Sequence, residues 1–421
     1  MTASHTQPNW RKTKLGDYFR IKHGYAFKGE FFSDEGPYVL LTPGNFQVDG
    51  GIKLKGEREK YYTGDFPKEF LLKRGDFLIV MTDLTQNAPI LGSPALIKED
   101  DKFLHNQRLG KIVELNESEM DRMFLYYLFN TTSVRAQIKA SATGATVRHT
   151  APDRIYAVKV EVPSLSIQRR IASILSAYDD LIENNTRRIK ILEEMARLIY
   201  REWFIEFRAP GVKLRKAAPE EQKVTGKDVF PLGWELKRLG DMCTIVMGQS
   251  PKSEFYNEKG EGLPFHQGVT DFGDRFPANR VYCTVENRIA ETGDVLFSVR
   301  APVGRINIAN KKIVIGRGLC AIRSKTGSQT FVFQQLKEQF QEEDTMGGGT
   351  IFKSVTKEDM HGIKAVSPTP DVIVQFEEIV SPIFKELEVL TEKCGILRRT
   401  RDLLLPKLVS GEVEVEKLSI E

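Results

Sequence analysis

The chain contains few cysteines and none of the cysteine patterns that bind metals or form disulfide frameworks. Its four cysteines are widely separated and form no C-x-x-C motif; they are Cys243, Cys283, Cys320 and Cys394. A zinc knuckle or a disulfide scaffold is therefore not expected, and a reducing cytoplasm is the natural location.

Motifs of known catalytic sites are also absent. The sequence has no G-x-x-x-x-G-K-[ST], no H-E-x-x-H and no G-x-S-x-G, which excludes the usual phosphate-loop, zinc-protease and serine-hydrolase signatures. Residues 316–321 match G-x-G-x-x-A, but a dinucleotide site needs a helix directly after that motif. Residues 322–327 instead suggest a short strand and a turn. The sequence therefore shows no recognised catalytic motif and no cluster with the spacing of metal ligands.

Long apolar runs and a strong net charge are missing as well. No run approaches the roughly 18 apolar residues that span a bilayer, and residues 1–14 contain no apolar signal core. The net charge is +4, from 61 Lys+Arg and 57 Asp+Glu. This balance excludes a uniformly basic coat but allows local basic surfaces for nucleic acid. The length of 421 residues suggests two or three globular domains.

The chain repeats itself, and this is its most informative feature. Shifting residues 10–44 by 224 positions gives 11 identities in 35 positions. The matched residues are Trp10/Trp234, Leu15/Leu239, Gly16/Gly240, Asp17/Asp241, Ile21/Ile245, Gly24/Gly248, Lys28/Lys252, Glu30/Glu254, Phe31/Phe255, Gly36/Gly260 and Gly44/Gly268. Later matches, such as Ile191-Leu192 with Ile396-Leu397, have an offset of 205. The sequence is therefore a duplication in which the second copy has shorter loops.

The first part of each copy predicts a globular α+β domain. Short apolar runs bounded by turn residues, such as 77–80 and 295–297, are typical of strands, and residues 117–130 suggest a helix. The predicted fold is two pseudo-symmetric α/β domains separated by two long antiparallel coiled-coil helices.

The second part of each copy predicts a long amphipathic helix with a narrow apolar seam, which is the pattern of a coiled coil. The expected seam residues are Ile171, Ile174, Tyr178, Leu181, Asn185, Leu192 and Ile199 in the first copy, and Phe376, Ile383, Leu387, Leu390, Leu397 and Leu404 in the second. The simplest partner of each helix is the other one. Asn185 either sets the register of the pair or lies at a solvated edge. Pro382 should kink or interrupt the second helix.

The globular parts carry basic and amide side chains in predicted loops. Arg and Lys suit phosphates and guanine edges, and Asn and Gln can recognise adenine. The candidate DNA-binding residues are Lys22, Lys28, Asn45, Gln47, Gln86, Asn87, Arg108, Arg148 and His149 in the first copy, and Lys252, Gln267, Arg275, Arg280, Arg300, Arg305, Arg317 and Lys353 in the second. Matched loops beside Ala88-Pro89 and Ala301-Pro302 suggest that both copies perform the same task on a split DNA site.

The helices resemble a known family. Residues 181–196 (LIENNTRRIKILEEMA), followed by 200–204 (YREWF), resemble the central conserved helix of type I restriction–modification specificity subunits. Residues 397–411 (LRRTRDLLLPKLVSG) resemble the C-terminal conserved region of that family. Residues 80–92 with 106–108, and 295–304 with 316–318, look like its two target-recognition domains.

The resemblance implies a specificity subunit that reads the two halves of a bipartite asymmetric DNA site and has no catalysis of its own. Its helices would set the spacer and dock two methyltransferase subunits, and two restriction subunits would join them. No cofactor would be bound by this chain. S-adenosylmethionine, ATP and Mg would be bound by the partners. The expected location is the cytoplasm of a bacterium or archaeon, close to the nucleoid and without membrane contact.

The expected organisation is target-recognition domain 1 at 1–163, a central helical region at 164–207, a connector at 208–232, target-recognition domain 2 at 233–368, and a C-terminal helical region at 369–421. Two alternatives remain. One is a stand-alone regulator whose two domains bind operator half-sites. The other is a nuclease that uses acids such as Asp76 and Asp294, although the Gly-Asp pairs in which they occur are typical of turns.

Overall fold

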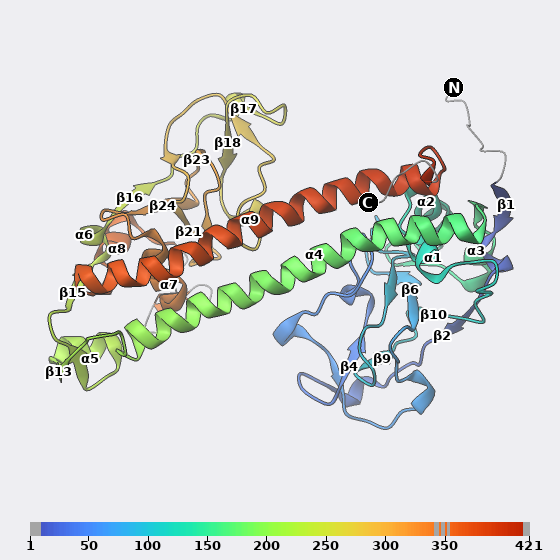
Figure 1. Ribbon diagram of the computed structural model, residues 1–421, viewed down its shortest axis with the longest axis horizontal. Coiled ribbons are helices and arrows are strands. Elements are labelled where there is room, and N and C mark those ends of the chain that lie inside the picture. Colours follow the sequence, from blue (N-terminus) through green and yellow to red (C-terminus); the bar gives the residue numbers. More distant parts are fainter. Residues whose placement is uncertain (1–9, 341–344, 347–349, 352–353, 416–421) are drawn as a thin grey trace. The chain divides into compact units, whose positions relative to one another are not determined.

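The computed structural model describes residues 10–340, 345–346, 350–351 and 354–415 (Figure 1). The chain divides into two compact units. The first unit consists of residues up to 184 together with residues from 393 onward, and the second unit consists of residues 185–392. The boundary crosses both long helices, so each unit contains one globular domain and one stretch of each helix.

The globular domain of the first unit is built on two four-stranded sheets. The central antiparallel sheet has the order β2 (Arg20–His23), β10 (Leu109–Val113), β6 (Phe77–Val80) and β8 (Pro94–Leu96). The outer sheet has the order β3 (Phe32–Ser33), β5 (Tyr61–Tyr62), β4 (Tyr38–Leu41) and β9 (Phe103–His105), with β4 and β9 parallel. Two pairs complete the domain, β1 (Arg11–Lys14) with β12 (Lys159–Val162) and β7 (Thr82–Asp83) with β11 (Arg148–His149).

The second unit repeats this plan. Its central sheet has the order β16 (Cys243–Met247), β24 (Leu319–Ser324), β21 (Val295–Ser298) and β22 (Ile306–Ile308). Its outer sheet has the order β17 (Tyr256–Asn257), β19 (Tyr282–Cys283), β18 (Leu263–His266), β23 (Ile313–Ile315) and β20 (Ile289–Ala290), with β18 and β23 parallel. The pair β15 (Glu235–Arg238) and β27 (Lys364–Ser367) corresponds to β1 and β12. The motif at 316–321 leads into strand β24 and not into a helix.

The short helices cover one face of each central sheet. They are α1 (Arg122–Phe129), α2 (Thr132–Ala140) and α3 (Pro152–Tyr156) in the first unit, and α6 (Leu239–Met242), α7 (Gln329–Gln339) and α8 (Lys357–Gly362) in the second. Side-chain caps start several of them. Asp121 accepts a hydrogen bond from Phe124 N, and Thr356 accepts one from Asp359 N.

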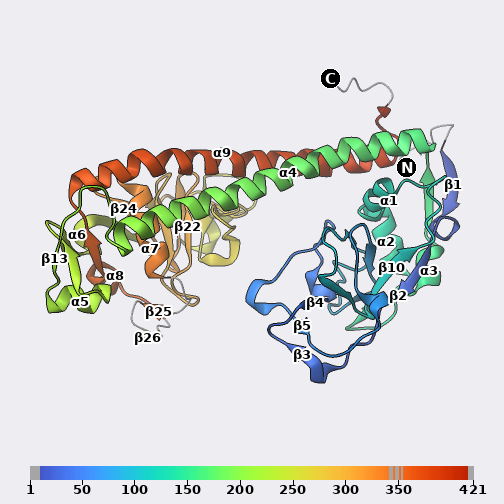
Figure 2. The same cartoon turned by 60° about the horizontal axis from the view of Figure 1, so that its bottom comes forward.

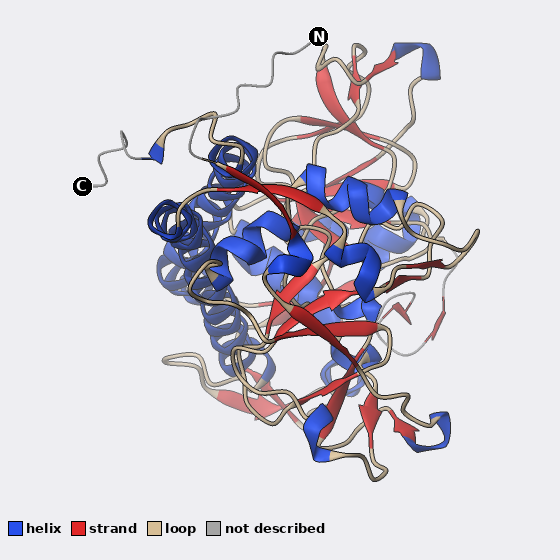
Figure 3. Ribbon diagram, turned by 90° about the vertical axis from the view of Figure 1, so that its right-hand side faces the viewer, coloured by secondary structure: helices blue, strands red, loops and turns tan. Residues whose placement is uncertain are grey.

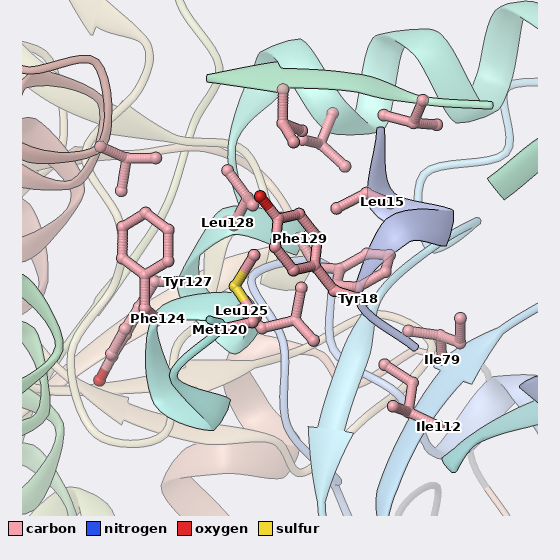
Figure 4. Packing of buried hydrophobic residues seen from close by; sticks show 14 of the residues in the cluster. Leu15, Tyr18, Ile79, Ile112, Met120, Phe124, Leu125, Tyr127, Leu128 and Phe129 are labelled. Atoms are coloured by element: carbon pink, nitrogen blue, oxygen red, sulfur yellow. The ribbon is translucent and has the colours of Figure 1, made fainter. Parts of the chain in front are cut away.

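Alternation along β6 explains the layered arrangement. Phe77 and Ile79 point into a core shared with the helices, whereas Leu78 and Val80 point into a second core on the other face. Figure 4 shows Ile79 in the helix-side core with Phe124 and Leu125 of α1. In β21 of the second unit, Val295 belongs to the helix-side core and Leu296 to the other. Both faces of each central sheet are therefore buried, which gives the mixed α+β architecture shown in Figure 3.

The two long helices are α4 (Leu165–Tyr200) and α9 (Pro370–Val409), and they pack together in both units (Figure 2). In the first unit, Cys394 Sγ lies 3.9 Å from Ile182 O, and Arg401 contacts Asp179. One residue number rises as the other falls, so the two segments are antiparallel. Helix α9 continues through Pro382, whose side chain is exposed, so the predicted interruption does not occur.

Burial along the helices defines a heptad seam. Its positions in α4 follow a 4-3 spacing through Ile171, Leu175, Tyr178, Ile182, Asn185, Ile189, Leu192, Ala196 and Ile199. In α9 the spacing runs through Phe376, Val380, Ile383, Leu387, Leu390, Cys394, Leu397, Arg401, Leu404 and Leu408.

Two predicted seam residues were wrong. Leu181 is 51% exposed and Ile174 is half-buried, and their neighbours Ile182 and Leu175 are the buried ones. The predicted positions 171, 178, 185, 192 and 199 lie on the seam because they repeat every seven residues. The error arose at the second apolar position of each heptad, where two adjacent apolar residues compete for the seam.

The predicted connector is itself folded. Strands β13 (Leu214–Lys216) and β14 (Val229–Pro231) pair antiparallel and enclose helix α5 (Pro219–Thr225). Phe230 is fully buried against Phe207, which lies just after the π-helical turn Arg201–Ile205 that ends α4. Among the described residues, no helix has a stretch long and apolar enough to span a membrane.

Candidate nucleic-acid interface

In the first unit, several loops meet at one edge of the central sheet. Met81 N donates to Arg108 O at 3.0 Å, Thr150 N donates to Met81 O at 2.9 Å, and Gln107 N donates to Tyr25 O at 3.0 Å. These bonds bring four chain segments side by side. We call this set the first row, and it consists of Tyr25, Gln107–Arg108, Thr82–Asn87 and Arg148–His149.

Buried side chains fix the backbone of the loop that follows β7. The buried carboxylate of Asp83 accepts hydrogen bonds from Thr85 N, Thr85 Oγ1 and Ile90 N, at 2.8–2.9 Å. The buried Arg135 donates a hydrogen bond to Pro89 O at 2.7 Å, and the charge of Asp83 favours its protonated form. The loop therefore presents exposed Gln86 and Asn87 from a pre-organised backbone.

The basic residues of the first row differ in their freedom. Arg108 is exposed and has no carboxylate partner among the described residues. Arg148 donates to the carbonyl oxygens of Lys139 and Ala142, so its guanidinium is partly engaged at the end of α2. His149 Nδ1 lies 3.0 Å from Thr82 Oγ1.

The second unit has a corresponding edge. Ser250 Oγ donates to Gln267 Oε1 at 2.7 Å, and Arg317 N donates to Ser250 Oγ at 3.2 Å. Arg300 forms a backbone bridge with Ser354. The second row consists of Gln249–Ser250, Gln267, Arg317, Arg300–Arg305 and Ser354. The exposed side chains of Arg300 and Arg317 have no carboxylate partner in the described part of the chain.

A buried serine organises the loop of the second row. Ser298 Oγ donates to Pro302 O at 2.7 Å and accepts from Arg305 N at 2.8 Å. The turn therefore leaves the side chain of Arg305 exposed at its end. Ser298 and Asp83 thus have the same role in the two units, because each is a buried side chain that hydrogen-bonds to the backbone of the loop that follows it.

Equivalent backbone hydrogen bonds establish that the two rows are the same site. Val299 N donates to Gly318 O at 3.0 Å as Met81 N donates to Arg108 O, and Val355 N donates to Val299 O at 2.9 Å as Thr150 N donates to Met81 O. Arg108 therefore corresponds to Gly318. Arg317 therefore corresponds to Gln107, which is the register that the stretches 106–108 and 316–318 give when they are aligned end to end.

Two candidate residues are buried against carboxylates. Asn45 is buried, and its Nδ2 donates to Glu59 Oε2 at 2.9 Å. Arg275 is buried and forms an ion pair with Glu193 at 2.7 Å. A loop position suggested exposure for both, but each side chain turns inward to a carboxylate. Lys353 lies outside the described residues.

The remaining candidates lie beside the rows or away from them. Lys22 pairs with Glu69 at 2.6 Å, and Arg280 pairs with Asp271 at 3.2 Å. Lys28 and Lys252 occupy equivalent exposed positions and have distant carboxylate neighbours, Glu30 at 3.9 Å and Glu254 at 3.8 Å. Gln47 is exposed in a loop whose tip contacts α9 and not the first row.

The two aspartates that a nuclease could use have structural partners. Asp76 pairs with Lys111 at 2.8 Å, and Asp294 pairs with Arg323 at 2.7 Å. Each aspartate follows a glycine of positive φ, Gly75 or Gly293, and accepts a hydrogen bond from a turn amide. They are turn residues with a strand partner.

Burial lowers the pKa of His105 to about 4 and raises the pKa of Cys243 to about 12, so neither group titrates near neutral pH. Among the described residues, no cluster of three His, Cys, Asp or Glu side chains could hold a metal ion.

Comparison with known proteins decides the family. The model of the type I restriction modification DNA specificity domain matches residues 8–194 and 231–388, which is most of the chain. The chain belongs to this family. The two matched stretches coincide with the two copies of the duplication and contain the two rows.

Individual relatives agree. The type I restriction enzyme HindI specificity subunit of Haemophilus influenzae is 23% identical, with 96% of this chain and 100% of the relative covered. A specificity subunit of the MjaIX restriction enzyme of Methanocaldococcus jannaschii is 27% identical, with 80% of this chain and 78% of the relative covered. The crystal structure of a type I S subunit from M. genitalium has a TM-score of 0.59 at 19% identity, over 97% of this chain and 98% of that one, and so shares the fold.

This chain is therefore a DNA-specificity subunit of a type I restriction–modification system, and it is not itself catalytic. The family expected from the two helix motifs is confirmed. The fold class is also confirmed, with two globular halves and the two long helices packed together.

Proposed function

We propose that the first row reads one half of a bipartite DNA site and the second row reads the other half. One observation carries this proposal. The same backbone framework appears twice and presents different exposed side chains. The first row offers Gln86, Asn87 and Arg108, whereas the second offers Arg300, Arg305 and Arg317. Amides suit adenine and guanidinium groups suit guanine, so two different half-sites, and hence an asymmetric target, follow.

Lys28 and Lys252 are proposed to contact phosphates. They occupy equivalent positions, each directly before a short 3₁₀ helix, and their ammonium groups are exposed. Their ion pairs with Glu30, at 3.9 Å, and Glu254, at 3.8 Å, are exposed and therefore weak in water. Contacts of this kind would position each domain on the duplex without selecting a base.

The long helices are proposed to set the spacer between the half-sites and to dock two methyltransferase subunits. Docking is supported by apolar side chains that point away from the seam. On α4 these are Leu181, Ile191, Met195 and Leu198, and on α9 they are Val389, Ile396 and Leu403. Positions 191, 195 and 198 lie on one helix face, and so do positions 389, 396 and 403, which are seven residues apart. An exposed apolar stripe of this kind is typical of an interaction surface.

The chemistry would then be performed by partners. The methyltransferase subunits would bring S-adenosylmethionine and methylate adenine, and restriction subunits would bring ATP and Mg. The specificity subunit would contribute base recognition and geometry alone.

The test is single-molecule methylation sequencing of DNA from cells that carry this chain with and without its neighbouring methyltransferase. We expect a split motif with N6-methyladenine in both halves, present only when both proteins are present. Absence of new methylation despite a purified complex would contradict the proposal and favour the operator-binding regulator. Specific binding by the chain alone, mapped to operator half-sites, would establish that alternative.

A further inference from the structure

Each globular domain has a hairpin loop that reaches the paired helices of its own unit. In the first unit this loop spans residues 47–51, and Gln47 N donates to Gly51 O at 3.1 Å. In the second unit it spans residues 273–276, and Gly273 N donates to Phe276 O at 3.2 Å. Bridges Phe46–Ile52 and Phe272–Pro277 flank the two loops. We call them the tip loops, and Asp49 and Arg275 lie at corresponding places in them.

The first tip loop presents an acid to a basic helix position. Asp49 Oδ2 accepts from Arg401 Nη2 at 3.1 Å, and Arg401 Nη1 donates to Asp179 of α4 at 2.7 Å. Arg401 occupies a seam position, and its side chain is only 13% exposed although it is charged. Burial alone would lower the pKa of Arg401, but the hydrogen bonds that it donates to Asp179 and Asp402 raise this pKa, so the guanidinium stays charged. One arginine therefore joins the domain to both long helices.

The second tip loop presents a base to an acidic helix position. Arg275 Nη2 donates to Glu193 Oε1 of α4 at 2.7 Å, and the arginine side chain is 6% exposed. Its guanidinium also lies over the rings of Phe384 of α9, at 5.1 Å, and Phe333 of α7, at 5.7 Å. This contact too joins the domain to both long helices.

The two contacts have opposite polarity, because the first tip loop supplies the acid and the second supplies the base. The helix residues that they contact also differ between the two units. With the offset of 205 residues that relates the helices, Arg401 corresponds to Ala196 and Asp179 corresponds to Phe384. The first stretch of paired helices therefore offers a buried arginine. The second offers a glutamate and an aromatic ring. On the other stretch, Asp49 would meet Ala196 in place of Arg401, with Glu193 one turn away. Arg275 would meet Arg398 in place of Glu193, close to Arg401 and Asp179. Each tip loop would therefore lose its ion pair and lie near a like charge.

We propose that the Asp49–Arg401 and Arg275–Glu193 contacts are two clamps of opposite polarity that fix each recognition domain on its own stretch of the paired helices and prevent the domains from exchanging places. The clamps act through the orientation of the domains, so Asp49, Arg275, Glu193 and Arg401 are positioning residues. In a family that reads split sites, the clamps restrict which recognition domain a given half of the chain accepts.

The test is a full-length chain whose domains are exchanged between structurally equivalent junctions. Leu15 N donates to Val158 O as Leu239 N donates to Ile363 O, so residues 15–158 and 239–363 are swapped. We expect the exchanged chain to unfold at a temperature about 5–10 °C below that of the natural chain, because both ion pairs are lost and the buried Arg275 lies near arginines instead of Glu193. Adding Asp49→Arg and Arg275→Asp to the exchanged chain should recover at least half of this loss.

The matched control is the exchanged chain with Asp49→Asn and Arg275→Gln, which removes the repulsion without restoring attraction. Greater recovery with the charge-reversed pair than with the neutral pair supports the clamps. Equal recovery with both pairs, or an exchanged chain as stable as the natural one, would overturn the proposal.

A second measurement applies if the exchanged chain does not fold. In the natural chain, Arg275→Asp should lower the unfolding temperature, and Arg275→Asp with Glu193→Arg should restore part of it. Arg188→Gln, which breaks the exposed pair with Glu386, is the control and should have little effect. No restoration by the double variant would contradict the clamp. Unfolding is measured without DNA, so these results are independent of any failure of the methylation experiment.

Discussion

Arg317 of the second unit occupies the position that Gln107 occupies in the first. The equivalence follows from the hydrogen bonds of the next residue, since Gly318 O and Arg108 O accept from corresponding amides of the adjacent strand. A short amide and a long guanidinium thus project from the same backbone position in the two domains. A difference of this kind at an equivalent place is what two unlike half-sites require.

Replacing Arg317 should affect one half-site only. We expect Arg317→Gln to weaken binding of the methyltransferase complex to its target by about 1–3 kcal/mol and to relax base preference at one position of one half. Methylation of a library with each base randomised in turn would measure this. Lys311→Gln, an exposed position in the loop between β22 and β23, is the control. Equal loss at both halves would indicate an assembly defect and contradict the assignment.

The equivalent lysines should act without regard to sequence. We expect Lys28→Gln and Lys252→Gln each to reduce the slope of log K against log salt by about one and to weaken binding to specific and non-specific DNA alike. Titrations at several salt concentrations would show the change. A loss confined to the specific target would instead assign these lysines to base recognition.

Helix α4 should bind the methyltransferase through its exposed apolar stripe. Leu198 lies outside the seam and is exposed, so Leu198→Glu should leave unfolding of the isolated chain nearly unchanged. It should reduce association with the methyltransferase at least tenfold, because a charge would be buried at an apolar contact. Leu54→Glu, an equally exposed leucine in the first domain, is the control for association. Undiminished assembly with Leu198→Glu would remove this stripe from the interface.

The chain should lose stability in mild acid through His105. Burial lowers the pKa of this histidine to about 4 from an ordinary value of 6.5, so the unfolded chain binds the proton more tightly. The contribution is complete above about pH 6.5, declines as the pH falls towards 4, and amounts to about 3 kcal/mol over that window. Urea unfolding at pH 7 and pH 5 would measure it. The variant His105→Gln should show a smaller difference between the two pH values, and an unchanged difference would assign the effect to other groups.

The heptad seam illustrates how far periodicity could be carried. The spacing of seven residues placed Tyr178, Asn185 and Leu192 on one face, because the α-helical repeat is a local property. It could not choose between Leu181 and Ile182, which differ by only one position around the helix. The choice was made by packing against α9, which lies some 200 residues away in the chain.

Two buried candidate residues illustrate what local pattern cannot show. Arg275 looked like a surface arginine in a loop rich in Gly and Asp, and Asn45 looked like a base-reading amide. Both are buried because a carboxylate from elsewhere lies beside them, Glu193 for one and Glu59 for the other. The sequence around Arg275 or Asn45 does not predict which carboxylate will lie beside it.

The sequence by itself determined the duplication, the mixed strand and helix content, the two long helices and the family, because repeats, alternation and heptads are written in residue order. Tertiary structure alone decided which loops meet at the sheet edge, that Asn45 and Arg275 turn inward, and that Arg401 contacts Asp49. The physical reason is distance along the chain. Asp49 and Arg401 are 352 positions apart, and their contact exists only after the sheets and the helices have packed.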